Sequence, residues 1–240
     1  MPFPLAHPAA VLPLRRYGRF SFSALVIGSV VPDLGYMFAS LRLDEFSHTF
    51  AGSLGFGLPA GLVVFWVFTR ARSKVVQMLP NRLQNAVASS TSGEAIPPYT
   101  VVISLLIGTW THIIWDSFTH KNGWIVLHLA VLQQPIGSMF GHTVRVFHLL
   151  WYISSFVGVA VLWLAYEKWK RRQNIGQKSF SPGARAASSK AMLLGVLALA
   201  LGAAHHLHSW IIFSLTGLAT ALVLLAVEWR NWARLPLNSN

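Results

Sequence analysis

Five apolar stretches, each close to the length of a membrane-spanning helix, constrain this chain more than any other feature. They cover residues 50–69, 99–118, 146–166, 191–207 and 210–229. A helix needs about 20 apolar residues to cross a bilayer. Only 11% of the 240 residues are charged, whereas a soluble domain carries about 25%. We therefore expect an all-α fold, a polytopic membrane helical bundle with about five spans.

The N-terminal 40 residues fit two alternatives. Apolar runs at 5–14 and 22–31 are separated by a segment with three arginines. Each run makes only about 15 Å of helix. Either a sixth span covers about 21–40, or the two runs form a re-entrant helical hairpin. The hairpin would bring His7 level with Asp33.

The chain shows no internal repeat and no linker between two domains. We predict one membrane domain over residues 1–240. It would contain a core at 1–165, a basic loop at 166–190 and a C-terminal helix pair at 191–240.

The charges are distributed as topology signals. The net charge is +12, but the basic residues lie between apolar runs instead of forming one soluble face, so nucleic acid is not an expected partner. With the predicted spans, all but three of the 19 Lys and Arg residues fall on one side of the membrane. The exceptions are Arg42, Lys121 and Arg145. The positive-inside rule makes the basic side cytoplasmic, and most His residues then lie at the other face.

The strongest chemical motif is His112-x3-Asp116-x3-His120. This i, i+4, i+8 spacing places the three side chains on one face of a helix. An Asp at the centre of a membrane helix costs about 2.5–3.5 kcal/mol, which a bound metal ion could offset. The alternative is a buried polar network that only fixes helix packing. His120 precedes Asn122 and Gly123, so the helix could end before it.

Other candidates depend on how the chain folds. Asp33 follows Pro32 and could be a ligand or a solvated residue at a helix end. His48 opens the first clear span and could be a ligand or an interfacial residue. Arg145 could bind an anionic substrate group or snorkel from a helix start. The remaining histidines are expected to have no part in the main site. His128, His142 and His148 would be interfacial or packing residues, and His205, His206 and His208 would be solvated in a tight loop.

Several motifs together resemble a bacterial membrane family, domain of unknown function 4184. They are the opening Met-Pro-Phe-Pro-Leu-Ala-His-Pro, Val-Pro-Asp at 31–33, Ser-His at 47–48 and Thr-His-Ile-Ile-Trp-Asp-Ser-Phe-Thr-His at 111–120. The family is more remotely similar to inner-membrane metal-dependent hydrolases. Those relatives have His-Arg-Gly where this chain has Leu43-Asp44-Glu45-Phe46. One histidine and one arginine of their pattern are therefore missing.

The resemblance implies a bacterial inner-membrane metal-dependent hydrolase that uses metal-activated water. The expected position of the site, just below the outer membrane surface, would suit a lipid or lipid-linked (phospho)ester as substrate. The implied ligands are His7, Asp33, His48, His112 and Asp116, with His120 optional. Asp33 and Asp116 would also be catalytic, and Arg145 would contact the substrate. Zinc is the expected divalent ion for His/Asp ligation, with manganese or magnesium as alternatives. A transporter or ion pathway, or a non-enzymatic scaffold, remains the alternative function.

Overall fold

The computed structural model describes residues 3–77, 84, 96–139 and 142–172. The chain divides into two units, residues 1–175 and 176–240. Only the first contains described residues. The expected spans at 191–207 and 210–229, and the histidines at 205, 206 and 208, lie outside them.

Three helical segments in the described part are long and apolar enough to cross a membrane. The first joins α4 (Phe50–Gly52), a short π-helix η4 (Ser53–Gly57) and α5 (Leu58–Gln77). The second is α7 (Pro98–Thr119), continued by α8 (Trp124–His128), and the third is α9 (Val146–Arg172). They coincide with the first three expected spans, so the protein is suited to a membrane.

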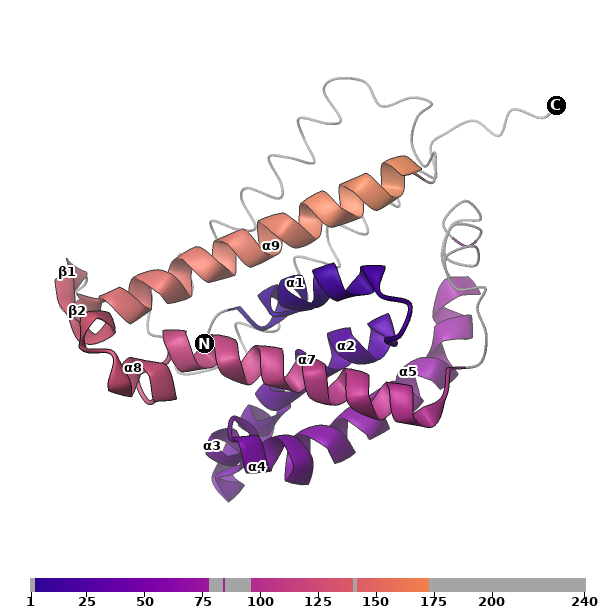
Figure 1. Ribbon diagram of the computed structural model, residues 1–240, viewed down its shortest axis with the longest axis horizontal. Helices are drawn as coiled ribbons and strands as arrows, with labels where there is room; N and C mark the ends of the chain where they lie inside the picture. Colours follow the sequence, from indigo (N-terminus) through magenta and orange to yellow (C-terminus); the bar gives the residue numbers. More distant parts are fainter. Residues whose placement is uncertain (1–2, 78–83, 85–95, 140–141, 173–240) are drawn as a thin grey trace. The chain divides into compact units, whose positions relative to one another are not determined.

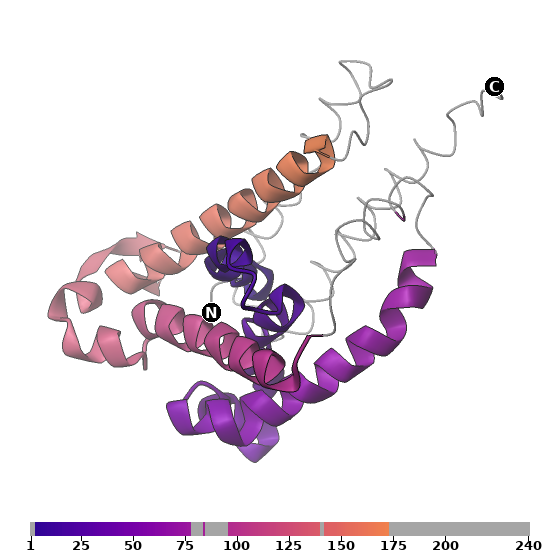
Figure 2. The same cartoon turned by 45° about the vertical axis from the view of Figure 1, so that its right-hand side comes forward.

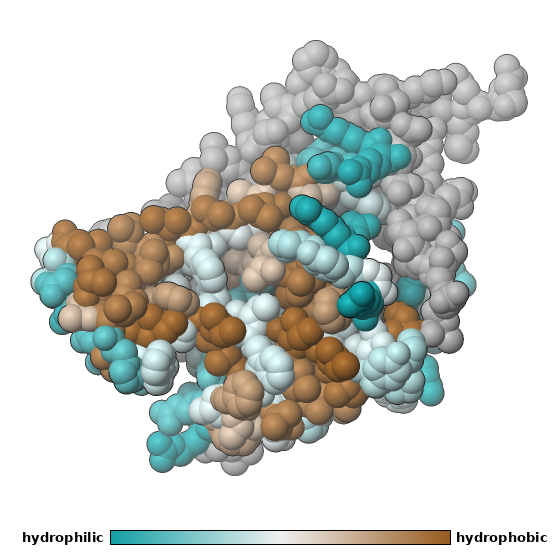
Figure 3. All heavy atoms as spheres, in the orientation of Figure 1, coloured by the Kyte–Doolittle hydropathy of each residue, from teal (hydrophilic) through white to brown (hydrophobic). Residues whose placement is uncertain are grey.

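The long helices expose large apolar side chains that a soluble protein would bury. Val63 is 62% exposed, Trp66 55% and Leu164 66%. Figure 3 shows hydrophobic residues over much of the visible face of α9, with hydrophilic residues gathered near its C-terminal end. Extended apolar surfaces of this kind are typical of contact with lipid or protein.

The N-terminal segment folds back on itself. Short helical pieces η1 (Pro4–Ala6), α1 (Pro8–Val11) and η2 (Leu12–Arg16) lead to a turn, after which α2 (Phe22–Gly28) and η3 (Val31–Leu41) follow. Prolines at the starts of the first three pieces keep them short, because proline cannot continue a hydrogen-bonded helix from its N-terminal side. This is the geometry of the hairpin alternative, and α1 lies between α7 and α9 (Figures 1 and 2).

The contact between α2 and α7 is unusually close. A Cβ at Gly28 would collide with the Leu105 backbone, and one at Gly108 would collide with the Leu25 carbonyl oxygen. Thr109 Oγ1 donates to the Gly28 carbonyl at 3.2 Å. Small residues let membrane helices approach backbone to backbone. The two glycines therefore fix the position of α2 on α7.

The chain is mostly helical, but it is not wholly so. Strands β1 (Pro135–Met139) and β2 (His142–Arg145) form an antiparallel hairpin before α9. A turn of helix, η5 (Ala130–Gln133), leads into it, and α3 (Leu43–Ser47) precedes α4. The sequence prediction of an all-α fold missed this hairpin because its strands are only five and four residues long.

Candidate metal site

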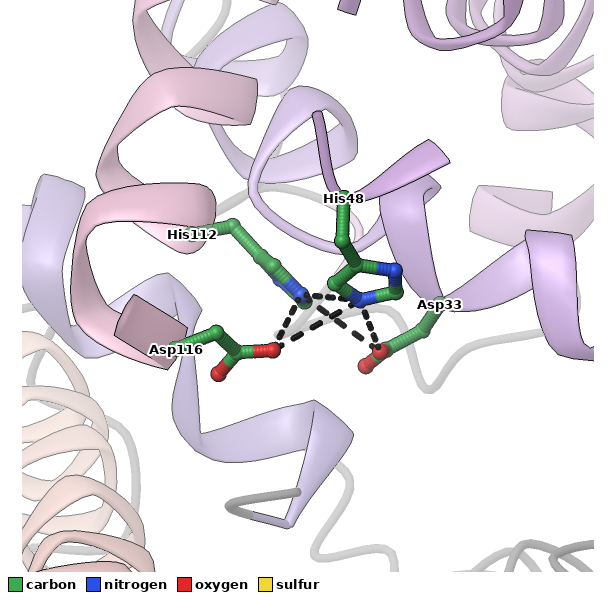
Figure 4. Close-up of side chains that lie close together, drawn as sticks. All are labelled: Asp33, His48, His112 and Asp116. Atoms are coloured by element: carbon green, nitrogen blue, oxygen red, sulfur yellow. Dashed lines mark hydrogen bonds and ion pairs between the residues drawn. The ribbon is translucent and has the colours of Figure 1, made fainter. Parts of the chain in front are cut away.

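Four side chains from three segments converge to form what we call the His/Asp cluster. His112 and Asp116 extend from α7, Asp33 from η3, and His48 from the end of α3. Each contributes one ligand atom, and these four atoms all lie within 4.8 Å of one another. Figure 4 shows the side chains pointing toward a common centre.

The separations between the ligand atoms fit coordination to a single ion. His112 Nε2 lies 3.2 Å from Asp116 Oδ2 and 3.4 Å from Asp33 Oδ1. His48 Nε2 lies 3.5 Å from each of the same two oxygens and 3.3 Å from His112 Nε2. A tetrahedral ion with ligands at about 2.1 Å separates neighbouring ligand atoms by about 3.4 Å. Five edges of such a tetrahedron are therefore present.

The second nitrogen of each cluster histidine is held by a backbone carbonyl. His112 Nδ1 lies 2.8 Å from the Ser29 carbonyl oxygen, and His48 Nδ1 lies 2.8 Å from that of Asp44. A carbonyl only accepts hydrogen bonds, so both Nδ1 atoms must carry the proton. In the neutral rings, the Nε2 lone pairs then face each other and the two carboxylates. A cation is what such a set of acceptors requires, and this second-nitrogen bond is typical of metal-bound histidine.

The carboxylates are buried and lack hydrogen-bond donors. The Asp33 and Asp116 side chains are 8% and 6% exposed. Among the described residues, none donates a hydrogen bond to any of their four oxygens. Two buried carboxylates without donors are costly. A divalent ion would balance their two negative charges and leave the site neutral.

Local packing sets the position of each ligand. Ser47 Oγ donates to the Pro32 carbonyl at 2.9 Å, which ties the residue before Asp33 to the residue before His48. Gly35 allows this contact, because a Cβ there would collide with Ser47 Oγ. The close α2–α7 contact in turn brings the Ser29 carbonyl to His112. The ligands are thus positioned by two backbone contacts, one between η3 and α3 and the other between α2 and α7.

His7 and His120 flank the cluster on either side of Asp116. The His7 ring stacks on His112 with centroids 3.8 Å apart, and its Nε2 lies 3.6 Å from Asp116 Oδ1. The His7 side chain is only 1% exposed, and a neutral imidazole at this position would be suited to metal binding. His120 caps the C-terminus of α7, and its Nδ1 lies 3.1 Å from the Asp116 carbonyl. The expectation that the helix ends before His120 is confirmed.

The other candidates make local contacts. Arg145 lies on β2, where its guanidinium donates to the Gln133 carbonyl. His128 Nδ1 lies 2.7 Å from the Trp124 carbonyl, and His148 Nδ1 accepts from the Arg145 backbone N–H. The predicted contact between Arg145 and a substrate stays a prediction.

Sequence reasoning missed the backbone carbonyls of Ser29 and Asp44 as partners of the cluster histidines. Any residue type can supply a carbonyl, so only the fold identifies those two. Ser47 did carry a signal, since a serine beside a candidate ligand is a common orienting partner.

Comparison with known proteins gives a family and no function. No curated protein matches the chain, and no solved structure does. One family model covers residues 1–235, nearly the whole sequence, and its description is that of a domain of unknown function. The chain therefore belongs to the family DUF4184, Domain of unknown function.

Proposed function

We propose that this protein is a divalent-metal-dependent hydrolase of the bacterial inner membrane, acting on a lipid or lipid-linked ester or phosphoester. The observation that carries the proposal is the His/Asp cluster. Two imidazoles and two carboxylates supply four ligand atoms in a buried site, and five of the six distances between these atoms match the edges of a coordination tetrahedron. Zinc is the default ion for these ligands, with manganese or magnesium as alternatives.

In the proposed hydrolysis, the histidines and the carboxylates of the cluster would have different roles. A bound divalent ion would lower the pKa of a coordinated water to about 7. His48 and His112 would hold the ion, with their Nδ1 atoms fixed by the Asp44 and Ser29 carbonyls. The outer oxygen of Asp33 or Asp116 would accept the proton of the attacking water. Such a general base must lie within hydrogen-bond reach of that water.

The unbonded outer oxygens support a catalytic site over a purely structural one. Metal sites commonly hold their ligands through hydrogen bonds to the outer atoms. Here both histidines are held in this way, but neither carboxylate is. Asp116 Oδ1 faces His7 Nε2 at 3.6 Å, and no described residue donates a hydrogen bond to either atom. Asp116 Oδ1 is therefore an unbonded acceptor that is suited to water or a substrate group.

The distribution of charge supports a site near the outer face. Arg15, Arg72 and Trp169 line one cavity, which brings the hairpin tip and the C-terminal ends of α5 and α9 to the same end of the protein. Val101 of α7 lines that cavity too, and Asp116 lies about 22 Å further along the helix. The basic end would be cytoplasmic by the positive-inside rule, and the cluster would then lie toward the opposite face.

A metal assay tests the first half of the proposal. Wild-type protein purified in detergent should contain stoichiometric zinc, manganese or magnesium by mass spectrometry of the elements. His112→Gln should lose it. His128→Gln is the matched control, because His128 makes only a local bond to Trp124. A wild type without stoichiometric metal would exclude the proposal.

An activity assay tests the second half. Metal-loaded protein would be incubated in mixed micelles with phospholipids labelled on the acyl chain or the headgroup. We expect hydrolysis that is lost in Asp116→Asn and unchanged in Glu45→Gln, a control whose side chain pairs with Arg42 on the surface. Metal without hydrolysis would point to transport, which zinc or manganese uptake into vesicles would then measure.

A further inference from the structure

An apolar groove of about 510 Å³ lies beside the His/Asp cluster, between α1, α7 and α9. Its walls include Ala10 of α1, Trp115 and Phe118 of α7, and Ile153 and Val157 of α9. The volume is in the range of small-molecule binding pockets, about 300–1,000 Å³. We call this space the α7/α9 groove.

The groove follows the long axis of α9. Its lining on that helix runs from Leu150 to Val161, a rise of about 16 Å. Both α7 and α9 are candidate membrane spans, so this length lies within the apolar part of the protein. An unfilled space of this size would forfeit the dispersion contacts of its walls. In a bilayer the hydrocarbon chains of lipids are available to fill it.

The groove and the cluster share a wall. His7 and Thr119 line the groove. His7 also stacks on His112 and approaches Asp116 Oδ1, and Thr119 Oγ1 lies 3.3 Å from His120 Nδ1. Together with Ser154 of α9, these two residues are the polar members of an otherwise apolar lining, and His7 links the groove to Asp116. A molecule with an apolar tail in the groove would therefore present its polar end to the unbonded oxygen of Asp116.

We propose that the α7/α9 groove binds one hydrocarbon chain of a membrane lipid and thereby places the ester linkage of that lipid at Asp116 and His7. The part of this inference that concerns the ester linkage rests on the proposed function. The binding of the lipid's hydrocarbon chain in the groove does not depend on it. Gly158 defines the width of the groove, because a Cβ there would lie 2.7 Å from Ala6 Cβ. Specificity would come from the shape of the groove, since burial from lipid into protein gains little hydrophobic free energy.

Lipid retention tests the groove without relying on the metal. Delipidated full-length protein, stripped of metal with a chelator, would be titrated with dioleoylphosphatidylglycerol and measured by native mass spectrometry. We expect one saturable lipid on the wild type. Val157→Trp and Ala10→Phe, which fill the groove from two different helices, should weaken that binding at least tenfold.

Leu164→Trp is the matched control. Leu164 is 66% exposed on α9 and Val157 is 49% exposed on the same helix, so both positions should tolerate the larger ring. The control should bind lipid as the wild type does. Equal lipid binding by the wild type and all variants would overturn the proposal. A wild type that binds no saturable lipid would also overturn it, and this is the result expected if another part of this polypeptide fills the groove.

The outcomes separate this inference from the proposed function. Lipid binding that depends on the groove in a protein without stoichiometric metal would leave the inference standing and exclude the hydrolase. Metal and hydrolysis that are unaffected in Val157→Trp and Ala10→Phe would leave the hydrolase standing and exclude the groove as its substrate site.

Discussion

The two faces of α7 are packed in opposite ways. Toward α2, glycines at 28 and 108 bring the backbones together, and the Ser21 N–H donates to Ser104 Oγ at 2.9 Å. Toward α9, the same helix borders a groove of about 510 Å³, and Trp115 stays 45% exposed. His112 belongs to the close face, while Thr119 lines the groove.

This difference separates two requirements of a metal site in a membrane. Ligands must be held to within a few tenths of an ångström, which calls for a close and hydrogen-bonded contact. A substrate must be able to enter, which calls for incomplete packing. Asp116 lies between the two faces, with Oδ2 toward the cluster and Oδ1 toward His7. The comparison of the two faces predicts that substitutions on the α2 side of α7 will change stability and metal binding more than substitutions on the α9 side.

The largest effect should come from Gly108→Val. The new side chain would overlap the Leu25 carbonyl and the Ser29 backbone N–H, so α2 would have to separate from α7. We expect a loss of about 3 kcal/mol or more of stability, together with loss of bound metal. Thermal unfolding in detergent measures the first and elemental analysis the second.

Gly18→Ala is the control for that change. A Cβ at Gly18 would meet no atom within 4 Å, so stability and metal content should stay as in the wild type. If Gly108→Val had the same unfolding temperature as Gly18→Ala, the close packing between α2 and α7 would be refuted.

The next largest effect should come from Asp33→Asn, and its sign should depend on the metal. The substitution removes one of the two charges that balance a divalent ion, so we expect at least a 100-fold loss of metal affinity. Without metal, the same change relieves repulsion between Asp33 and Asp116 and should stabilise the protein. Unfolding curves with and without zinc would show the opposite signs. A loss of stability in both conditions would instead favour the packing-network alternative.

A smaller effect is expected from Ser47→Ala. The variant loses the hydrogen bond from Ser47 Oγ to the Pro32 carbonyl, a net cost of about 1 kcal/mol. Asp33 and His48 would be less well fixed, and residues that orient ligands change metal affinity by about 10–100-fold. Zinc titration against a competing chelator measures this. Ser117→Ala, which removes only a local bond to the Ile114 carbonyl, should leave the affinity unchanged.

Sequence reasoning predicted the elements better than their contacts. The three long helices follow from apolar length alone, because membrane-spanning helices must satisfy their backbone internally. The convergence of Asp33 and His48 on α7 could only be inferred from charge distribution and resemblance. Those residues lie far from His112 in the chain, and their meeting depends on close packing at Gly28, Gly35 and Gly108. Glycine is too common in membrane helices for its positions to reveal this.

The β1–β2 hairpin and the α7/α9 groove show a different limit. The hairpin strands are too short to produce a clear alternation. A helix start is one of the two positions that the sequence allows for Arg145, whereas the structure has it in β2, directly before α9. The groove is a space that the described side chains of α1, α7 and α9 leave between them. No periodicity in either helix encodes that space, which is defined only by the arrangement of α1, α7 and α9.

The smallest effect should come from Gly158→Ala, on the loose face. Its Cβ would lie 2.7 Å from Ala6 Cβ and 3.0 Å from the Ala6 carbonyl oxygen. Because η1 and α1 are short segments, they can move away from α9 together at a cost of about 1 kcal/mol. His7 follows Ala6 and would move with it, while His48 and His112 stay held by the Asp44 and Ser29 carbonyls. We therefore expect weaker lipid binding with metal affinity within about threefold of the wild type. A loss of metal as large as that in Asp33→Asn would show that α1 supports the cluster as firmly as α2 does, and the distinction between the two faces of α7 would fail.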